Sequence, residues 1–141
     1  MRKYSICLFA FAAGFAAFAA EIAFTGGAEG TGTELTEPAN WDGGALPSAE
    51  DVACISDVAG TDLTIATDFT VAGIKFTTAA SLMNISSADE GVEVLPRLKI
   101  GGSGVVLVQS QSKDYGLILN VPVEILAEQE WELGKKALKT Y

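Results

Sequence analysis

The chain has no histidine, and its 141 residues include only nine Lys and Arg against 18 Asp and Glu. Without imidazole, the most common general base and the usual nitrogen ligand of metals are missing, and so are the Ser-His and Cys-His pairs of nucleophilic catalysis. The net charge of −9 makes nucleic acid a poor partner, because phosphate binding needs a basic surface. Any acid-base chemistry would therefore fall to carboxylates.

Cysteine is also scarce, with two residues in the whole chain. The first, Cys7, lies in an apolar run from Ile6 to Ala19 that follows the basic start Met1-Arg2-Lys3. A basic start, an apolar stretch and small residues at its end form the pattern of an export signal, and the run is shorter than the ~20 residues that span a membrane. We therefore predict a signal peptide over residues 1–19 and a secreted or cell-surface protein.

Cleavage after residue 19 would leave Cys54 as the sole thiol, which excludes an intramolecular disulfide. This residue lies in Val52-Ala53-Cys54-Ile55, a short apolar stretch of residues that favour strands. Free cysteine is among the residue types most often buried in proteins. We therefore expect a small buried side chain rather than a reactive thiol.

The mature chain divides into two parts by composition. Residues 20–51 are rich in Gly, Thr and Glu and contain Pro38 and Pro47, which is typical of turns and loops. Trp41 lies in this part, and we expect it to cover an open end of the core rather than to form an exposed binding platform. Residues 52–141 consist of short runs in which apolar and polar residues alternate, as in half-buried strands. The first part is therefore predicted to cap the second.

These runs predict an all-β fold and leave two architectures open. Apolar positions recur about every 19 residues, as from Leu63 to Leu82 and from Leu98 to Leu117, and such periods are typical of a solenoid. The strands of an antiparallel β-sandwich recur at half that spacing and would produce the same pattern. Hairpin dipeptides such as Asn-Gly are absent from this region, whereas glycine corners occur at Gly101-Gly102-Ser103-Gly104. The corners favour the solenoid.

Four segments carry motifs that can be recognised together: Phe24-Thr25-Gly26-Gly27, Glu37 to Pro47 with Asn40-Trp41-Asp42-Gly43-Gly44, Ile100-Gly101-Gly102-Ser103-Gly104-Val105, and Leu117 to Leu133 with Gln129-Glu130-Trp131. The first two resemble the opening of autotransporter-associated β-strand repeat proteins, which are exported bacterial surface proteins. The third is similar to the start of a coil in that family. The fourth is similar to its most recognisable repeat, in which a proline-containing strand leads into a Gln-x-Trp strand.

The resemblance implies a short right-handed parallel β-helix of about four to five coils with a loop-rich N-terminal cap, as in passenger domains carried to the cell surface. It implies no catalytic, cofactor-binding or metal-binding residues, so none is assigned. Family members typically run far longer and often finish with a membrane barrel or a sorting tail, whereas this sequence reaches Tyr141 without an apolar C-terminal segment. We therefore expect the N-terminal portion of a longer passenger.

A stacked coil would give particular positions to several residues near the C-terminus. Pro122 cannot donate to a strand ladder and belongs at a corner or at a strand's first residue, and Asn120 could pair with amides of neighbouring coils. Trp131 would face inward. The last coil would leave an open strand edge, which this chain could protect only with Lys135, Lys136 and Lys139. We therefore expect self-association through the open end.

The carboxylates that could perform chemistry are Asp42, Asp51, Asp57, Asp62, Asp68, Asp89, Glu90 and Asp114. Paired carboxylates can hydrolyse glycosides, and β-helix folds host polysaccharide-cleaving enzymes. These acids mostly lie beside Gly, Ser or Thr in predicted turns, where a solvated face is the ordinary explanation. Calcium is a second option, but the spacing fits neither an EF-hand loop nor a Gly-Gly-x-Gly-x-Asp repeat.

The sequence therefore predicts a secreted or surface-exposed, non-enzymatic structural or adhesive module. Its expected partner is a cell-surface or extracellular polysaccharide or protein, and neither a cofactor nor nucleic acid is expected. The alternative is a carbohydrate-active β-helix protein, or a fragment of one, that binds or cleaves polysaccharide.

Overall fold

The computed structural model describes residues 19–27, 29–30, 32–56, 60–78, 82–89, 91–109 and 116–133. The predicted signal peptide, apart from Ala19, lies outside these residues. The described part is mostly β-strand, and its helical structure consists of two short 3-10 turns, η1 (Pro38–Asn40) and η2 (Asp42–Gly44). In this part, no helix has the length and apolar character needed to cross a membrane.

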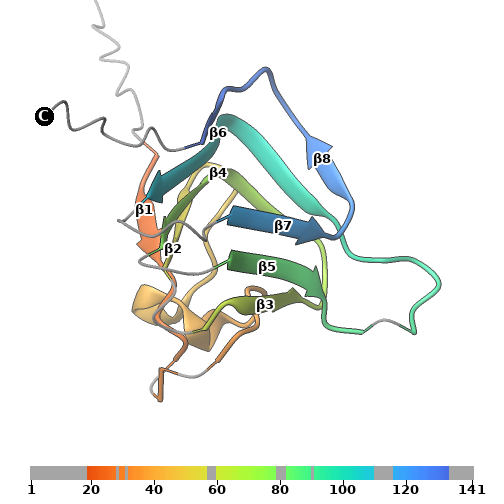
Figure 1. The fold of residues 1–141 in the computed structure, drawn as a ribbon. Helices are drawn as coiled ribbons and strands as arrows, with labels where there is room; N and C mark the ends of the chain where they lie inside the picture. The colour runs from red at the N-terminus through yellow and green to blue at the C-terminus, as the bar shows by residue number, and fades with distance from the viewer. Residues whose placement is uncertain are drawn as a thin grey trace, which may run out of the picture.

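The strands form two sheets (Figure 1). Their bounds are β1 (Glu21–Ala23), β2 (Val52–Ser56), β3 (Asp62–Ile65), β4 (Phe69–Thr78), β5 (Leu82–Ser87), β6 (Leu98–Gln109), β7 (Gly116–Asn120), β8 (Val123–Ile125) and β9 (Trp131–Leu133). The large sheet has the order β1-β2-β4-β6-β8, with β9 also pairing with β6, and the small sheet has the order β3-β5-β7. From β2 to β8 the chain passes alternately between the two sheets.

All pairings between these strands are parallel. This confirms an all-β fold with parallel sheets. It also shows that the alternative of an antiparallel β-sandwich is wrong, because neighbouring strands of such a sandwich run in opposite directions. Parallel neighbours need a long connection between them, and from β2 to β8 that connection includes a strand of the other sheet.

The strand register corrects the expected repeat of about 19 residues. In the small sheet, Leu63 pairs with Ile85, 22 positions further along, and Ile85 pairs with Leu119, a step of 34. In the large sheet, Val52 pairs with Gly73, a step of 21. The steps differ because the connections between strands differ in length. Stacking determines which apolar residues meet, and it does not require equal spacing along the chain.

The core consists of inward-facing residues that lie in register on successive strands. In the large sheet, Ala53, Ile74 and Val105 follow one another as partners, and each is at most 1% exposed. In the small sheet, Leu63 and Ile85 are partners, and both are fully buried. Burial of a large aliphatic side chain stabilises the fold by about 1.5–3 kcal/mol. Each such row is therefore a source of stability that no strand could supply alone.

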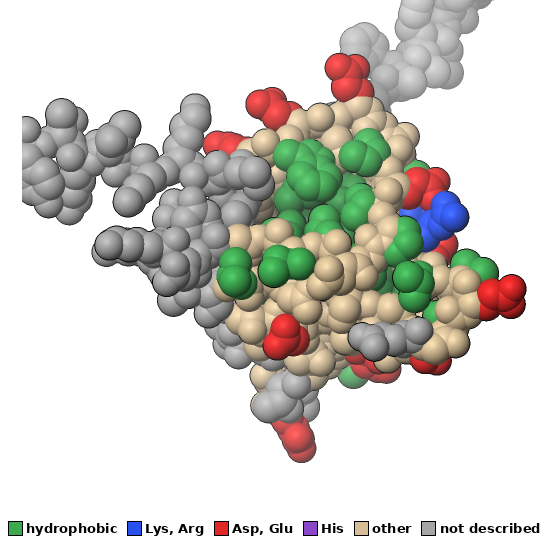
Figure 2. All heavy atoms as spheres, turned by 45° about the vertical axis from the view of Figure 1, so that its right-hand side comes forward, with side chains coloured by type: hydrophobic (Ala, Val, Ile, Leu, Met, Phe, Trp, Pro, Cys, Tyr) green, Lys and Arg blue, Asp and Glu red, His purple; other side chains and the backbone are tan. Residues whose placement is uncertain are grey.

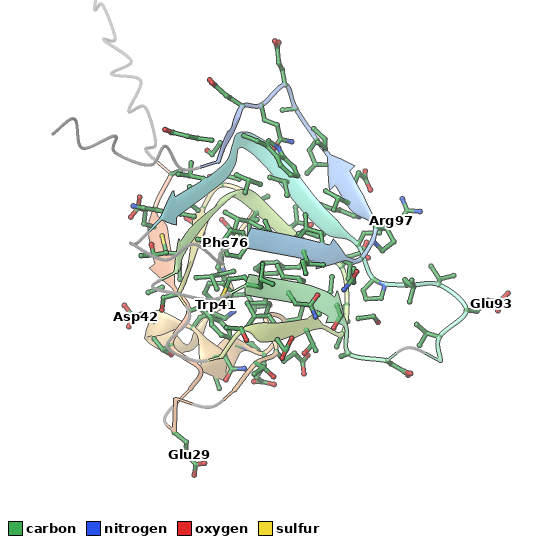
Figure 3. The ribbon with its side chains drawn as sticks, in the orientation of Figure 1. Glu29, Trp41, Asp42, Phe76, Glu93 and Arg97 are labelled. Carbon is green, nitrogen blue, oxygen red and sulfur yellow. The ribbon has the colours of Figure 1, made fainter. Side chains whose placement is uncertain are left out.

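Trp41 is buried in this core rather than exposed at the surface (Figure 3). It is 2% exposed and lies between Phe24 and Phe69, with ring centroids 5.1 and 5.7 Å away. Its indole N–H donates a 2.8 Å hydrogen bond to the carbonyl oxygen of Leu35, so its polar atom is satisfied although it is buried. The surrounding segment, expected to consist of turns and loops, also contains the short strand β1.

Candidate interaction surfaces

Asp51 and Asp68, two carboxylates weighed for acid-base chemistry, are each held by local partners. Asp51 accepts hydrogen bonds from the backbone N–H and the hydroxyl of Ser48 at 2.8 and 2.6 Å, and the hydroxyl contributes most to its lowered pKa. Asp68 forms a 2.8 Å ion pair with Lys99 and accepts the N–H of Arg97 at 2.9 Å, and the Lys99 hydrogen bond is the main cause of its lowered pKa. A general acid at neutral pH needs a raised pKa, so neither group suits that role.

The remaining acids are spread over the molecule. Asp62 lies 3.4 Å from the side-chain amide of Asn84, Asp89 accepts the N–H of Gly91 at 2.9 Å, and Asp42 begins η2 at the surface. The other candidates, Asp57, Glu90 and Asp114, lie outside the described residues. Over the ranges that the structure describes, no three His, Cys, Asp or Glu side chains are grouped so that they could hold a metal ion. Asp42, Asp62 and Asp89 lie on different segments of the described structure.

Cys54 lies on the outer face of β2, which corrects the expectation of a buried side chain. Its neighbours Ala53 and Ile55 face the core, so the period of two places the thiol on the opposite side, where it is half-buried. It lies beside the 2.9 Å ion pair between Glu21 and Lys75. Burial, followed by the negative charge of Glu21, raises the pKa of the thiol. The reactive thiolate is therefore disfavoured, in line with the expected low reactivity.

The outer face of the small sheet carries a chain of polar side chains from its three strands. The amide nitrogen of Asn120 donates to the amide oxygen of Asn84 at 2.8 Å, and Asn84 in turn reaches Asp62. This confirms the prediction that Asn120 pairs with an amide of a neighbouring strand. Thr64 and Ser86 are register partners beside this chain. Because each side-chain amide has two N–H groups and an acceptor oxygen, the row retains donors and acceptors for a ligand.

Two exposed aliphatic side chains share this outer face. Leu82 is 52% exposed and lies on the same side of β5 as Asn84, two residues away, while Ile118 is 43% exposed and is the register partner of Asn84. We call the face formed by Asp62, Thr64, Leu82, Asn84, Ser86, Ile118 and Asn120 the small-sheet face. It combines hydroxyl, amide and aliphatic groups and contains no cation.

The outer face of the large sheet instead carries ion pairs. Lys75 pairs with Glu21 at 2.9 Å, and Arg97 lies 3.5 Å from Glu124. Together with the Lys99–Asp68 pair, these contacts join residues that are far apart in the chain. Exposed ion pairs of this kind contribute about 0–1 kcal/mol each to stability.

A third surface lies at the C-terminal end of the large sheet. Trp131 is the register partner of the fully buried Val105 and so continues an inward row, yet it is 39% exposed. Ile125 likewise continues the row of the fully buried Ile100 and is 54% exposed. The prediction that Trp131 faces inward therefore agrees with its register, but the side chain is not covered. Sequence reasoning did not single out Ile125, because its alternation with Glu124 predicts a buried position.

Ile125, Trp131 and Leu126, which is 49% exposed, form what we call the terminal apolar surface. Figure 2 shows a green apolar patch in the upper half of the molecule with red carboxylates along its upper border. Glu128, Glu130 and Glu132 are exposed in the same stretch of chain.

The two motif segments of the second half of the chain pack against each other at this end. Gln129 donates its side-chain amide to the carbonyl oxygen of Ile100 at 3.4 Å and accepts the indole N–H of Trp131 at 3.0 Å. Gly104 has a φ of 65°, and a Cβ placed on it would overlap the carbonyl oxygen of Glu130. Gly104 is therefore required both by its left-handed backbone and by the close approach of the next strand. The expected corner between strands is corrected, because Gly101 to Gly104 lie within β6, where the pairing with β4 shifts in register.

Comparisons of the chain with protein-family models, with curated proteins and with solved structures gave no match.

Proposed function

We propose that this chain is a short right-handed parallel β-helix that serves as a non-enzymatic structural or adhesive module of an exported protein. The observation that carries the proposal is the parallel register of both sheets, in which inward rows such as Ala53–Ile74–Val105 run from strand to strand. Alternation between the sheets suits a coil, and connections between parallel strands are nearly always right-handed.

The same proposal covers the two ends of the chain. Residues 1–19 would direct export, and residues 20–51 would cap the first coil, for which the buried Trp41 is the support. The proposed relationship to autotransporter-associated β-strand repeat proteins is supported by the stacking of Gly104 against the Gln129–Trp131 segment. These are the segments that carried the resemblance in the sequence.

The small-sheet face is the proposed adhesive surface. Its amide row offers hydrogen-bond donors and acceptors, and Leu82 and Ile118 offer apolar contact. Because this face has Asp62 and no cation, an anionic polymer would be repelled. An uncharged extracellular polysaccharide fits this chemistry best.

The test measures whether the mature chain is retained on immobilised neutral polysaccharides. Release of soluble sugar is measured in parallel, and we expect none. We expect retention of the mature chain, and we expect Asn84→Ala and Asn120→Ala to weaken it by about two- to tenfold per lost hydrogen bond. Lys75→Gln, on the opposite outer face, is the matched control and should bind normally. Release of product that is abolished by Asp62→Asn would contradict the proposal and favour a polysaccharide-cleaving enzyme.

A further inference from the structure

The terminal apolar surface has the features of an edge that accepts another strand. In the part of the chain that the structure describes, β8 and β9 pair with β6 on one side only. The backbone groups on the other side of such strands are a template for strand addition. Beside them, Ile125 and Trp131 hold inward register positions but are 54% and 39% exposed. A further strand would cover both side chains.

Charge indicates which strand this edge would accept. Glu124 alternates with Val123 and Ile125 and lies in register with Lys99, and Glu132 alternates with Trp131 and lies in register with Val106. Both carboxylates therefore face outward, on the side where the large sheet elsewhere pairs cations with carboxylates across strands. Glu124 already lies 3.5 Å from Arg97. An added strand would meet Glu124 and Glu132 with its own outward side chains, and cations at those positions would be favoured.

We propose that this edge binds a cationic β-strand of another polypeptide, in which apolar residues cover Ile125 and Trp131 and alternate with Lys or Arg opposite Glu124 and Glu132. The proposal goes beyond the adhesive role of the small-sheet face and does not depend on it, because the two surfaces share no residue.

A second copy of this chain fits the edge less well. At the opposite end of the large sheet, β1 presents Glu21, which is paired with Lys75 of β4 and offers no free cation to Glu124 or Glu132 of a head-to-tail copy. A tail-to-tail copy would oppose the same row of glutamates, with Glu128 and Glu130 near their own counterparts. Like charges placed across neighbouring strands are destabilising. The charge pattern therefore favours a basic partner.

The test uses the mature chain and a short peptide in which Lys and Val alternate, with a Glu-Val peptide of equal length as its match. Trp131 is exposed and Trp41 is buried, so a blue shift of tryptophan emission that is absent in Trp131→Phe reports on the edge. We expect the basic peptide to cause this shift and to slow amide exchange in residues 123–133.

Each of Glu124→Gln and Glu132→Gln should weaken binding of the basic peptide by about two- to fivefold. Glu29→Gln removes the same charge far from the edge and should have no effect (Figure 3).

Several outcomes would overturn the proposal. Equal binding of both peptides would show unspecific apolar contact. Amides of residues 123–133 that are protected in the free chain, and that lose protection when the chain is truncated after Leu133, would show that its own following residues occupy the edge. Protection that rises with protein concentration, together with a larger particle in light scattering, would show a second copy. If Trp131→Phe fails to fold, amide exchange of the unmodified chain still decides between these results.

Discussion

Val105 and Trp131 are register partners on adjacent parallel strands, yet Val105 is fully buried and Trp131 is 39% exposed. The two residues hold the same position in successive layers. They differ because Val105 has a strand on both sides, β4 and β9, whereas Trp131 has the described strand β6 on one side. In this fold, burial of an inward residue therefore depends on its layer as much as on its face.

This difference in burial predicts that replacing isoleucine by alanine lowers the free energy of unfolding more at position 74 than at position 125. Ile74→Ala should lower the free energy of unfolding by about 2–5 kcal/mol, because it leaves a cavity in a fully packed row. Ile125→Ala should cost about 1 kcal/mol or less, since its side chain is already 54% exposed. Urea unfolding of both variants measures the difference. Equal losses would contradict the stacked arrangement.

Gly104 provides a second prediction. Gly104→Ala should destabilise the packing of β9, because the added Cβ meets the Glu130 carbonyl and the backbone has a φ of 65°. Gly43 also has a positive φ, of 77°, but nothing lies within 4 Å of a Cβ placed there. Gly43→Ala should therefore lower the free energy of unfolding only because alanine is disfavoured in the left-handed conformation, by about 1–2 kcal/mol. Faster amide exchange in residues 131–133 of the Gly104 variant alone is the expected result.

The Asp68–Lys99 pair predicts a dependence of stability on pH. The hydrogen bond from Lys99 lowers the pKa of Asp68 from its ordinary 3.8, so this carboxylate binds its proton more weakly in the folded state. Its contribution is present above pH 3.8 and is lost as the pH falls through the lowered pKa. Thermal unfolding between neutral and acidic pH should show this loss, and Asp68→Asn should remove this part of the pH dependence. An unchanged profile in that variant would argue against the pair.

Lys99 predicts how stability depends on pH in the alkaline range. The hydrogen bond to Asp68 raises the pKa of Lys99 above its ordinary 10.5, so its contribution is complete below pH 10.5 and is lost as the pH rises through the raised value. Lys99→Gln should therefore reduce the pH dependence of thermal stability in the alkaline range as well as in the acidic range.

Cys54 should react slowly with thiol reagents. Its raised pKa, caused first by burial and then by the charge of Glu21, reduces the thiolate fraction near neutral pH. Glu21→Gln should speed alkylation because it removes the charge that disfavours the thiolate. Alkylation of the folded chain, compared with the urea-unfolded chain, gives the measurement. A Glu50→Gln variant, whose substitution is on another part of the surface, should react as the unmodified protein does.

Several features followed from the sequence because they are local. Alternation predicted strands, and the size of Trp41 predicted that it is buried rather than exposed. The break expected at Gly101-Gly102-Ser103-Gly104 was wrong, because β6 continues through these residues. Pro122 lies between β7 and β8, at the kind of corner expected for a residue without a backbone donor. Each of these predictions depends on the chemistry of a residue and its nearest neighbours in the chain.

Other features were decided only by the tertiary structure. Both faces of Val52-Ala53-Cys54-Ile55 are apolar, so the sequence could not say which side of β2 faces the core, and the packing placed Cys54 outside. The partners of each strand depended on connections of unequal length, which produced steps of 22 and 34 where a single repeat was expected. Exposure of Ile125 and Trp131 depended on which strands lie beside them. The sequence by itself determined the strands and their apolar character, whereas stacking decided their partners and their burial, because those depend on residues distant in the chain.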